Sequence, residues 1–444
     1  MDKQQVGVIG LGVTGVSCVD FLHAQGYRVT VFDTRDCPPE VDKLNGDVTL
    51  LLGPLTGTEL AKFPLLVVSP GLPLSLPAIQ FAIEQGVEVI GDIELFARQL
   101  QTQPYQHAKL VTITGSNGKS TVTTLLGEMA KQDNINVAVG GNIGIPALQL
   151  LAPNIDLYIL ELSSFQLETT HSLLADVATI LNISEDHLDR YDSFQHYAQT
   201  KQFIYTQSKK ALYNRDDLLT LPVNEAQPQN SFGFDERDYG IVKDEQGNIC
   251  LAHQGAPFFA VQQLKLSGKH NWLNALAAFA LGEAVGISKK AMLTTLKNYS
   301  GLRHRCEFIA DINGVRWIND SKATNVGATQ AALMGLSATI AGKVHVILGG
   351  EGKGADFSEL TAVLQEVEGL IVCFGKDAEQ IMAVSGRAQR VNNLDEAVQL
   401  IAANSDRGDL VILSPACASL DMYRNFMARG DHFKALVSAM EAQG

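Results

Sequence analysis

A glycine-rich segment with one lysine, Gly115-Ser-Asn-Gly-Lys-Ser-Thr121, follows an apolar run at residues 110–113 and precedes a helical apolar pattern. Free backbone N–H groups and a positive dipole end make a helix N-terminus a binding site for polyphosphates. Lys119 would contact the terminal phosphates of a nucleotide, and the Ser120 hydroxyl would coordinate Mg²⁺. A complete phosphate-binding loop has a glycine where this chain has Ile113, so the loop is a shortened variant. The segment predicts ATP binding; the alternative is an ordinary turn between a strand and a helix.

Three ionisable residues downstream of this loop are candidates for catalysis or metal binding. Glu161 ends an apolar run, where ATPases commonly place a carboxylate that holds Mg²⁺. His187 lies in a loop dense in charged residues, and Lys201 lies in a helical pattern at residues 194–205. Each has a simpler interpretation, because carboxylates at strand ends, single histidines and helical lysines are usually structural or solvated. The phosphate loop upstream favours a functional role for Glu161.

Two pairs of polar residues in the second half of the chain are of the types that bind a nucleotide. Asn271 and Asn274 share one helix face, from which they would contact a base or a phosphate, or would cap the helix. Asp320 and Lys322 follow an apolar run at residues 315–318. They offer a carboxylate for a ribose and an ammonium for a phosphate at the end of a strand, where α/β proteins keep their sites.

Two further loops carry groups that would bind an anion. Residues 349–354 form a second glycine-rich loop with Lys353, for which a mobile surface turn is the alternative. Residues 414–419 follow the last apolar run and offer hydroxyl and backbone N–H groups to a carboxylate.

The segment Gly10-Leu-Gly-Val-Thr-Gly15 matches a dinucleotide-binding fingerprint, and Asp33 lies near the position that usually contacts a ribose. This pattern suggests NAD. The same glycine-rich turn binds any pyrophosphate, including that of a UDP-sugar, so the fingerprint alone leaves both ligands open.

Composition excludes several classes of protein. A net charge of −14 over 444 residues argues against nucleic-acid partners and against binding to acidic membranes. The six cysteines are scattered without a C-x-x-C pair, which predicts reduced thiols. The apolar residues 6–19 lack the basic flank of a signal peptide, and no apolar run reaches transmembrane length. We expect a cytoplasmic protein.

Apolar runs alternate with helical patterns along the whole chain, which predicts α/β domains with parallel sheets. We expect three domains, at residues 1–100, 101–301 and 302–444, with a linker at residues 101–107 and a surface β-excursion at residues 224–257. The expected strands lie at residues 6–9, 28–32, 65–69, 156–161, 178–182, 315–318, 344–348, 369–374 and 410–413.

Several stretches, in this order along nearly the whole chain, resemble the Mur ligase family, and within it the ligases that add D-glutamate. They are Gly115 to Thr121, Gly140-Gly-Asn-Ile-Gly144, Glu161-Leu-Ser-Ser-Phe-Gln-Leu-Glu168, Asp186-His-Leu-Asp-Arg-Tyr191, Gly268-Lys-His-Asn271, Trp317-Ile-Asn-Asp-Ser-Lys-Ala-Thr-Asn325 and Ser414-Pro-Ala-Cys-Ala-Ser-Leu-Asp421. The Asp-Asn-Pro-Arg signature of the ligases that add diaminopimelate is absent from the sequence. Arg303 departs from the family pattern, in which a proline is expected.

The resemblance implies three domains: a Rossmann-like UDP-binding domain, a central ATPase-like domain with a parallel sheet, and a C-terminal Rossmann-like domain that binds the amino acid. It implies an ATP-dependent ligase of peptidoglycan precursor synthesis that joins D-glutamate to UDP-N-acetylmuramoyl-L-alanine through an acyl phosphate. ATP and two Mg²⁺ ions are the implied cofactors, and we expect a monomer without nucleic-acid or membrane partners.

The resemblance also implies roles for individual residues. The catalytic set would be Lys119, Glu161, His187 and Lys201. Metal ions would be held by Ser120, Glu161, His187 and Lys201, the last as a carbamate. ATP would contact Gly115, Ser116, Asn117, Gly118, Lys119, Ser120, Thr121, Asn271, Arg305 and Asp320. The UDP-substrate would contact Thr14, Asp33, Thr34, Arg35, Ser69, Gly71 and Asn142, and D-glutamate would contact Lys322, Thr324, Lys353, Ser419 and Phe426.

Two functions of other classes compete with this interpretation. A nicotinamide-dependent dehydrogenase would use the first glycine-rich turn but would leave the phosphate loop without a role. A non-enzymatic ATP switch would use the phosphate loop but has no need of Lys353 or Ser419. Folylpolyglutamate synthase and the other Mur ligases are the nearest alternatives among related enzymes.

Overall fold

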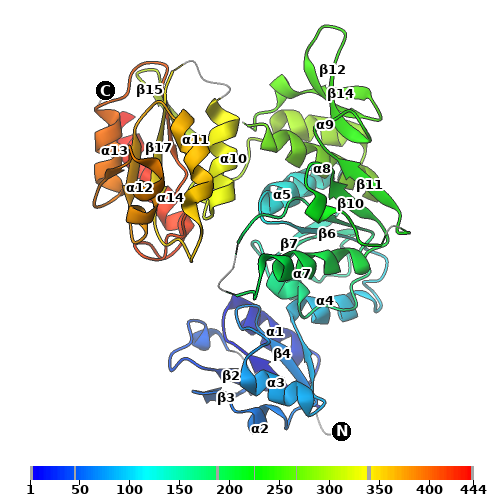
Figure 1. Ribbon diagram of the computed structural model, residues 1–444. Helices are drawn as coiled ribbons and strands as arrows, with labels where there is room; N and C mark the ends of the chain where they lie inside the picture. Colours follow the sequence, from blue (N-terminus) through cyan, green and yellow to red (C-terminus); the bar gives the residue numbers. More distant parts are fainter. Residues whose placement is uncertain are drawn as a thin grey trace.

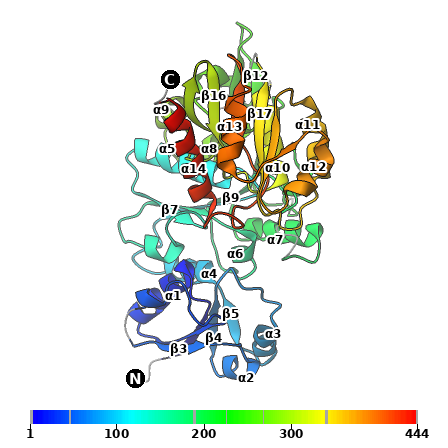
Figure 2. The same cartoon turned by 90° about the vertical axis from the view of Figure 1, so that its left-hand side faces the viewer.

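The computed structural model describes residues 4–44, 47–186, 190–224, 226–266, 268–337 and 342–441. Three separate β-sheets organise this part of the chain. In Figure 1 the first lies at the bottom in blue, the second above it in cyan and green, and the third beside the upper half of the second in yellow to red. Figure 2, turned by 90°, shows the first sheet again at the end of the molecule.

The first sheet is fully parallel and has the strand order β3-β2-β1-β4-β5. The chain order reverses between β1 and β4, which makes the gap beyond their carboxyl ends the expected ligand crevice. The strands are β1 (Gln5–Ile9), β2 (Arg28–Asp33), β3 (Thr49–Leu52), β4 (Leu65–Val68) and β5 (Glu88–Ile90), and the helices are α1 (Val13–Ala24), α2 (Gly57–Leu60), α3 (Pro77–Glu84) and α4 (Asp92–Leu100).

The second sheet has the order β14-β13-β12-β11-β10-β9-β6-β8-β7 and is parallel from β7 to β12. Helices α5 and α8 pack against each other on one face, over the fully buried Val111 and Ile159. The strands are β6 (Lys109–Thr114), β7 (Val137–Gly141), β8 (Leu157–Glu161), β9 (Val177–Ile180), β10 (Ala211–Asn214), β11 (Gln229–Phe232), β12 (Tyr239–Lys243), β13 (Ile249–His253) and β14 (Ala256–Ala260). The helices are α5 (Lys119–Gln132), α6 (Ser164–Leu167), α7 (Phe194–Thr206), α8 (His270–Val285) and α9 (Lys289–Asn298).

The third sheet has the order β15-β16-β20-β17-β18-β19 and is parallel except for the pair β15–β16. Helix α10 lies on the side that faces the second sheet (Figure 1) and contacts α8. The strands are β15 (Glu307–Ile312), β16 (Val315–Asn319), β17 (Val344–Gly349), β18 (Ile371–Phe374), β19 (Gln389–Arg390) and β20 (Leu410–Leu413). The helices are α10 (Val326–Ser337), α11 (Thr361–Glu366), α12 (Ala378–Ser385), α13 (Leu394–Ala402) and α14 (Phe426–Glu441).

The predicted fold class, α/β with parallel sheets, is confirmed, and each predicted strand overlaps a strand of the structure. The predicted β-excursion contains β11 to β13, which continue the second sheet, and β14 follows at its end. No helix in the described part of the chain is both long and apolar enough to cross a bilayer.

Candidate active site

The phosphate loop joins β6 to α5 at the centre of the second sheet. Gly118 has φ of 82°, and a Cβ atom there would lie 2.5 Å from Asn274 Oδ1, so only glycine fits. Asn182, beyond β9, holds the loop from the side: its Oδ1 accepts from the Asn117 N–H at 2.8 Å, and its Nδ2 donates to Asn117 O at 3.1 Å. The loop is therefore fixed before any ligand binds, with the N-terminus of α5 behind it.

Lys119 folds over this loop. Its ammonium donates to Gly115 O at 2.7 Å and to Ser116 O at 2.8 Å. Burial lowers the pKa of Lys119, and the charges of Glu161 and Asp186 partly offset this effect. The cation lies over loop carbonyl groups, within reach of an anion at the helix N-terminus.

Glu161, at the end of β8, offers a free buried oxygen. Its Oε1 accepts from Asn142 Nδ2 at 2.7 Å, whereas its Oε2 is buried and has no hydrogen-bond partner among the described residues. An unpaired buried carboxylate oxygen is costly unless a ligand completes it. This oxygen therefore fits Mg²⁺, which prefers oxygen ligands. His187 lies outside the described residues.

Lys201, on α7, is buried beside the phosphate loop. Its Nζ donates to Gly115 O at 3.2 Å and to Thr114 Oγ1 at 3.4 Å, and it lies 4.7 Å from the centre of the Tyr197 ring. Burial, followed by the nearby charge of Lys119, lowers the pKa of Lys201 well below its usual value. This environment favours the neutral amine.

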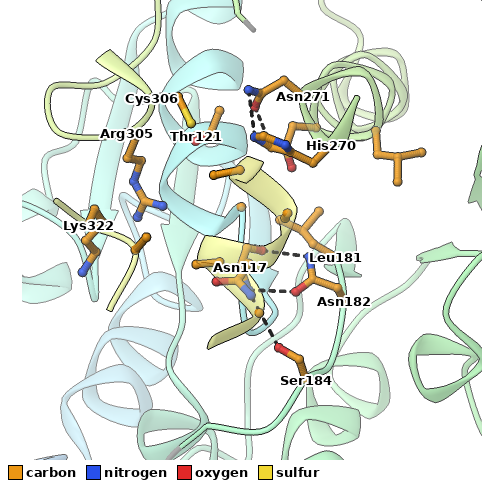
Figure 3. A pocket seen from close by; sticks show the side chains of 18 of the residues that line it. Asn117, Thr121, Leu181, Asn182, Ser184, His270, Asn271, Arg305, Cys306 and Lys322 are labelled. Carbon is orange, nitrogen blue, oxygen red and sulfur yellow. Dashed lines mark hydrogen bonds between the residues drawn. The ribbon is translucent and has the colours of Figure 1, made fainter. Parts of the chain in front are cut away.

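A cavity of about 380 Å³ opens beside the phosphate loop, between the second and third sheets (Figure 3). In that view Arg305 and Lys322 lie on one side, and His270 and Asn271 lie on the other. Arg305 donates to Ser120 Oγ at 2.7 Å, which links the start of the third domain to the phosphate loop.

The far side of the cavity is lined by polar groups from α8. Asn271 Oδ1 accepts from Asn274 Nδ2 at 2.9 Å, and Asn271 Nδ2 lies 3.1 Å from His270 Nε2. Burial lowers the pKa of His270 to about 4, so its neutral ring accepts this bond. The two asparagines thus form one buried amide pair at the cavity wall.

Asp320 follows β16 and lines the same cavity. It accepts from Ser414 Oγ at 2.8 Å and from the Cys306 N–H at 3.1 Å. Burial raises the pKa of Asp320 to about 6. The carboxylate is therefore mostly ionised at neutral pH, when it can accept hydrogen bonds from a ribose.

Predicted D-glutamate contacts come together on the third domain. The Lys322 ammonium lies 4.2 Å from the centre of the Phe426 ring, and burial lowers its pKa to about 8. Lys353, with φ of 56°, reaches across to the second domain, where its ammonium lies 3.4 Å from Asp186 Oδ1. Thr324 is half-buried just beyond Lys322.

The loops that carry Lys353 and Ser419 are bonded to each other. The Glu351 N–H donates to Ala418 O, and the Ala418 N–H donates to Glu351 O, each at 2.9 Å. Beneath them lies Arg429, which is fully buried and donates to the carbonyl groups of Ser321, Cys417, Ala418 and Gly349. This arginine therefore braces three loops at the carboxyl end of the third sheet.

The predicted UDP-substrate contacts of the first domain gather at the carboxyl ends of β1, β2 and β4. Asp33 is buried, and its carboxylate accepts from the Leu11 N–H at 2.7 Å and from Arg35 Nε at 2.8 Å and Nη2 at 2.6 Å. The bonds from Arg35 lead in holding the pKa of Asp33 down, at about 2. A Cβ atom on Gly10 would lie 2.8 Å from Ser69 Cβ, so the two loops lie against each other.

The remaining predicted contacts differ in exposure: Thr14 and Ser69 are half-buried, whereas Thr34, Arg35, Gly71 and Asn142 are exposed. Because the Asp33 carboxylate is occupied within the protein, it holds Arg35 and the first glycine-rich turn in place.

Family models match this chain in three successive parts. The Mur ligase MurD-like N-terminal domain matches residues 4–91, the Mur ligase middle domain matches residues 113–282, and the Mur ligase glutamate ligase domain matches residues 304–417. The chain is 49% identical over 442 residues to the UDP-N-acetylmuramoylalanine–D-glutamate ligase of Salmonella typhimurium, with 99% of each chain covered. It is 48% identical over 440 residues to the Escherichia coli K12 protein of the same name, with 98% of each covered.

The chain belongs to the Mur ligase family. Solved structures of the family share its fold. The UDP-N-acetylmuramate-alanine ligase MurC of Thermotoga maritima superposes with a TM-score of 0.62 at 17% identity, covering 99% of this chain and all of that chain. The MurF ligase of the same organism, solved with ADP, gives a TM-score of 0.64 at 16% identity, covering all of this chain and 96% of that chain. The predicted family and its three-domain organisation are confirmed.

Sequence reasoning missed the residues that hold the others in place. Asn182 is a polar residue directly after an apolar run, and Asp186 and Arg190 lie in the same short motif as His187. Arg429 had no local signal, because it lies in an amphipathic helix where an arginine is normally solvated.

Proposed function

We propose that this Mur ligase is the ATP-dependent enzyme that joins D-glutamate to UDP-N-acetylmuramoyl-L-alanine in peptidoglycan precursor synthesis. The observation that carries the proposal is the assembly of one site from two domains. Arg305 bonds to the phosphate loop and Lys353 pairs with Asp186, so cations of the third domain meet the nucleotide site of the second. An ATP switch does not need this arrangement, whereas a ligase must bring an amine to an activated acid.

A carboxylate is a poor electrophile, so ATP first converts it to an acyl phosphate. The carboxylate of the UDP-substrate attacks the γ-phosphorus, and ADP leaves. Lys119 would exchange its bonds to Gly115 O and Ser116 O for phosphate oxygens, and Arg305 would add a second positive charge. Asn271 and Asp320 would hold the nucleoside within the cavity.

Mg²⁺ would neutralise negative charge on the phosphates when bound. We propose that Ser120, Glu161 and His187 hold two such ions. Lys201 would contribute as a carbamate, which forms when a neutral amine adds to carbon dioxide and releases a proton. The burial that lowers the pKa of Lys201 favours that neutral amine.

The amine of D-glutamate then attacks the acyl carbon, and phosphate leaves from the tetrahedral intermediate. Lys322, Thr324, Lys353, Ser419 and Phe426 would hold the amino acid on the third domain. Closure of this domain against the second would exclude water, which would otherwise hydrolyse the acyl phosphate.

The first domain would bind the UDP-substrate through Thr14, Thr34, Arg35, Ser69 and Gly71, with Asp33 holding Arg35 in place, and Asn142 would contact it from the second domain. We place the domain boundaries at residues 100–101 and 301–302 and propose a monomer that acts in the cytoplasm.

Phosphate release measured against a panel of amino acids tests this function. With ATP and UDP-N-acetylmuramoyl-L-alanine present, release should require D-glutamate and should not be supported by L-glutamate, L-alanine or diaminopimelate. Equal release with a diamino acid would assign the chain to another ligase of the family. Release that ignores all amino acids would favour an ATPase switch.

UDP, and not NAD, should stabilise the first domain. The Asp33 carboxylate accepts from Arg35 and the Leu11 amide, and we expect these bonds to compete with the ribose of NAD. At a hundredfold excess over its Kd, a ligand adds about 2.7 kcal/mol to the free energy of unfolding. Thermal melting should therefore shift upward with UDP and remain unchanged with NAD or NADP. A shift with NAD alone would reverse the assignment.

Lys353→Ala should weaken D-glutamate binding selectively, because two carboxylates need a fixed positive charge as well as hydroxyl donors. We expect the KM for D-glutamate to rise by about 10- to 100-fold and the KM for ATP to change by less than about twofold. Lys376→Ala is the matched control, since Lys376 is exposed and pairs with Glu351 on the same face. Equal changes in both KM values would remove Lys353 from the amino-acid pocket.

A further inference from the structure

Arg190, in the second domain, bonds to the first domain through a contact that has no role in the proposed reaction. Its Nη2 donates to Leu72 O at 2.9 Å, and its Nη1 donates to Pro70 O at 3.4 Å. Both acceptors lie in residues 69–72, the loop that follows β4. The side chain is only 13% exposed, so this contact is buried between the domains.

Groups of the second domain hold the arginine in this orientation. Its guanidinium lies 4.5 Å from the centre of the Phe165 ring, and its Nη2 lies 3.5 Å from Glu168 Oε2. Both partners are in or next to α6, which is anchored by a capping box between Ser163 and Gln166. The planar guanidinium lies against the ring while its N–H groups, fixed in one plane, reach two acceptors; the ammonium of lysine has no such planar fork.

The two hydrogen bonds from Arg190 fix the orientation of the peptide groups in residues 69–72. In a planar trans peptide the C=O and the N–H point in opposite directions. Because Pro70 O faces Arg190, the Gly71 N–H of the same peptide unit faces away from it. This N–H has no hydrogen-bond acceptor among the described residues.

The loop that carries this amide borders the ligand crevice of the first sheet. The loop lies beyond β4 and the glycine-rich turn lies beyond β1, which are the two strands at the reversal of chain order. The loops approach so closely that a Cβ on Gly10 would lie 2.8 Å from Ser69 Cβ. Diphosphates bind at such a crevice through free backbone amides.

We propose that Arg190 is a positioning residue for the nucleoside-diphosphate substrate: from the second domain it fixes residues 69–72 of the first, with the Gly71 amide turned toward the diphosphate. This inference rests on the proposed function for the identity of the substrate. It also means that the first domain binds its ligand fully only when it is docked on the second.

The test measures binding of UDP and of UDP-N-acetylmuramoyl-L-alanine to the full chain by calorimetry, followed by the KM values of all three substrates. Arg190→Ala should raise both Kd values by about tenfold or more, and Arg190→Lys by less, since it keeps the charge and loses the planar fork of the guanidinium. The KM for ATP should change by less than about twofold. Arg98→Ala is the matched control, because Arg98 is an arginine of α4 that pairs with Glu88 and Glu94 and does not touch the loop.

Unchanged Kd values in Arg190→Ala would overturn the inference. So would a rise in the KM of all three substrates by the same factor, with no difference between the alanine and lysine variants, since a merely structural role predicts that result. If the wild type binds UDP but does not ligate D-glutamate, the proposed function fails. Weaker UDP binding in Arg190→Ala would then still support the role of Arg190.

Discussion

Lys119→Ala should reduce turnover by about 10²–10³-fold at saturating ATP. The substitution removes a positive charge that would stabilise the phosphate during its transfer. The ammonium lies over the loop and donates to Gly115 O and Ser116 O. Asn182 holds the loop independently through Asn117, so the fold should survive the substitution. The initial rate of phosphate release and the melting temperature are the two measurements.

The matched control is Lys131→Ala, on the same helix α5. Lys131 pairs with Glu128 at the exposed end of the helix, and its side chain is 59% exposed. Turnover of this variant should equal that of the wild type. Near-normal turnover in Lys119→Ala would mean that the loop does not bind the transferred phosphate.

Lys201→Ala should also be nearly inactive, with a loss of about 10²–10³-fold, if a carbamate at this position supplies negative charge to the metal site. Unlike Lys119→Ala, it should recover part of its activity when formate or acetate is added, because a small carboxylate can replace the missing charge. Lys209→Ala is the control, as Lys209 is exposed and pairs with Asp176.

Labelling with ¹³C-bicarbonate gives a readout independent of activity. The wild type should show one carbamate carbon signal that is absent from Lys201→Ala. A wild type without that signal, together with no rescue by carboxylates, would refute the modification and leave Lys201 as a buried structural amine.

The nucleotide half of the site could be predicted because its residues are contiguous in sequence. A loop such as residues 115–121 specifies its own geometry through glycines and a helix start. The residues that complete it come from far along the chain: Asn182 is 65 positions from Asn117, and Lys353 is 167 positions from Asp186. Such pairs depend on how sheets and domains pack, which local patterns do not encode.

The difference between local patterns and long-range packing also explains which strands could be predicted. The long buried strands β6 and β8 were predicted because parallel strands covered on both faces are continuous apolar runs. Strands β3 and β5, at the edges of the first sheet, were missed. They are short, and most of their residues are exposed or half-buried, so their sequence does not differ from that of a loop.

The proposed acyl-phosphate mechanism is tested most directly by following an oxygen atom from the substrate carboxylate to the released phosphate. UDP-N-acetylmuramoyl-L-alanine labelled with ¹⁸O in its terminal carboxylate is incubated with ATP and D-glutamate, and the released phosphate is analysed by mass spectrometry. If the carboxylate attacks the γ-phosphorus, each phosphate released with the dipeptide carries one labelled oxygen. Unlabelled phosphate would show that water takes the phosphoryl group, which would contradict the account.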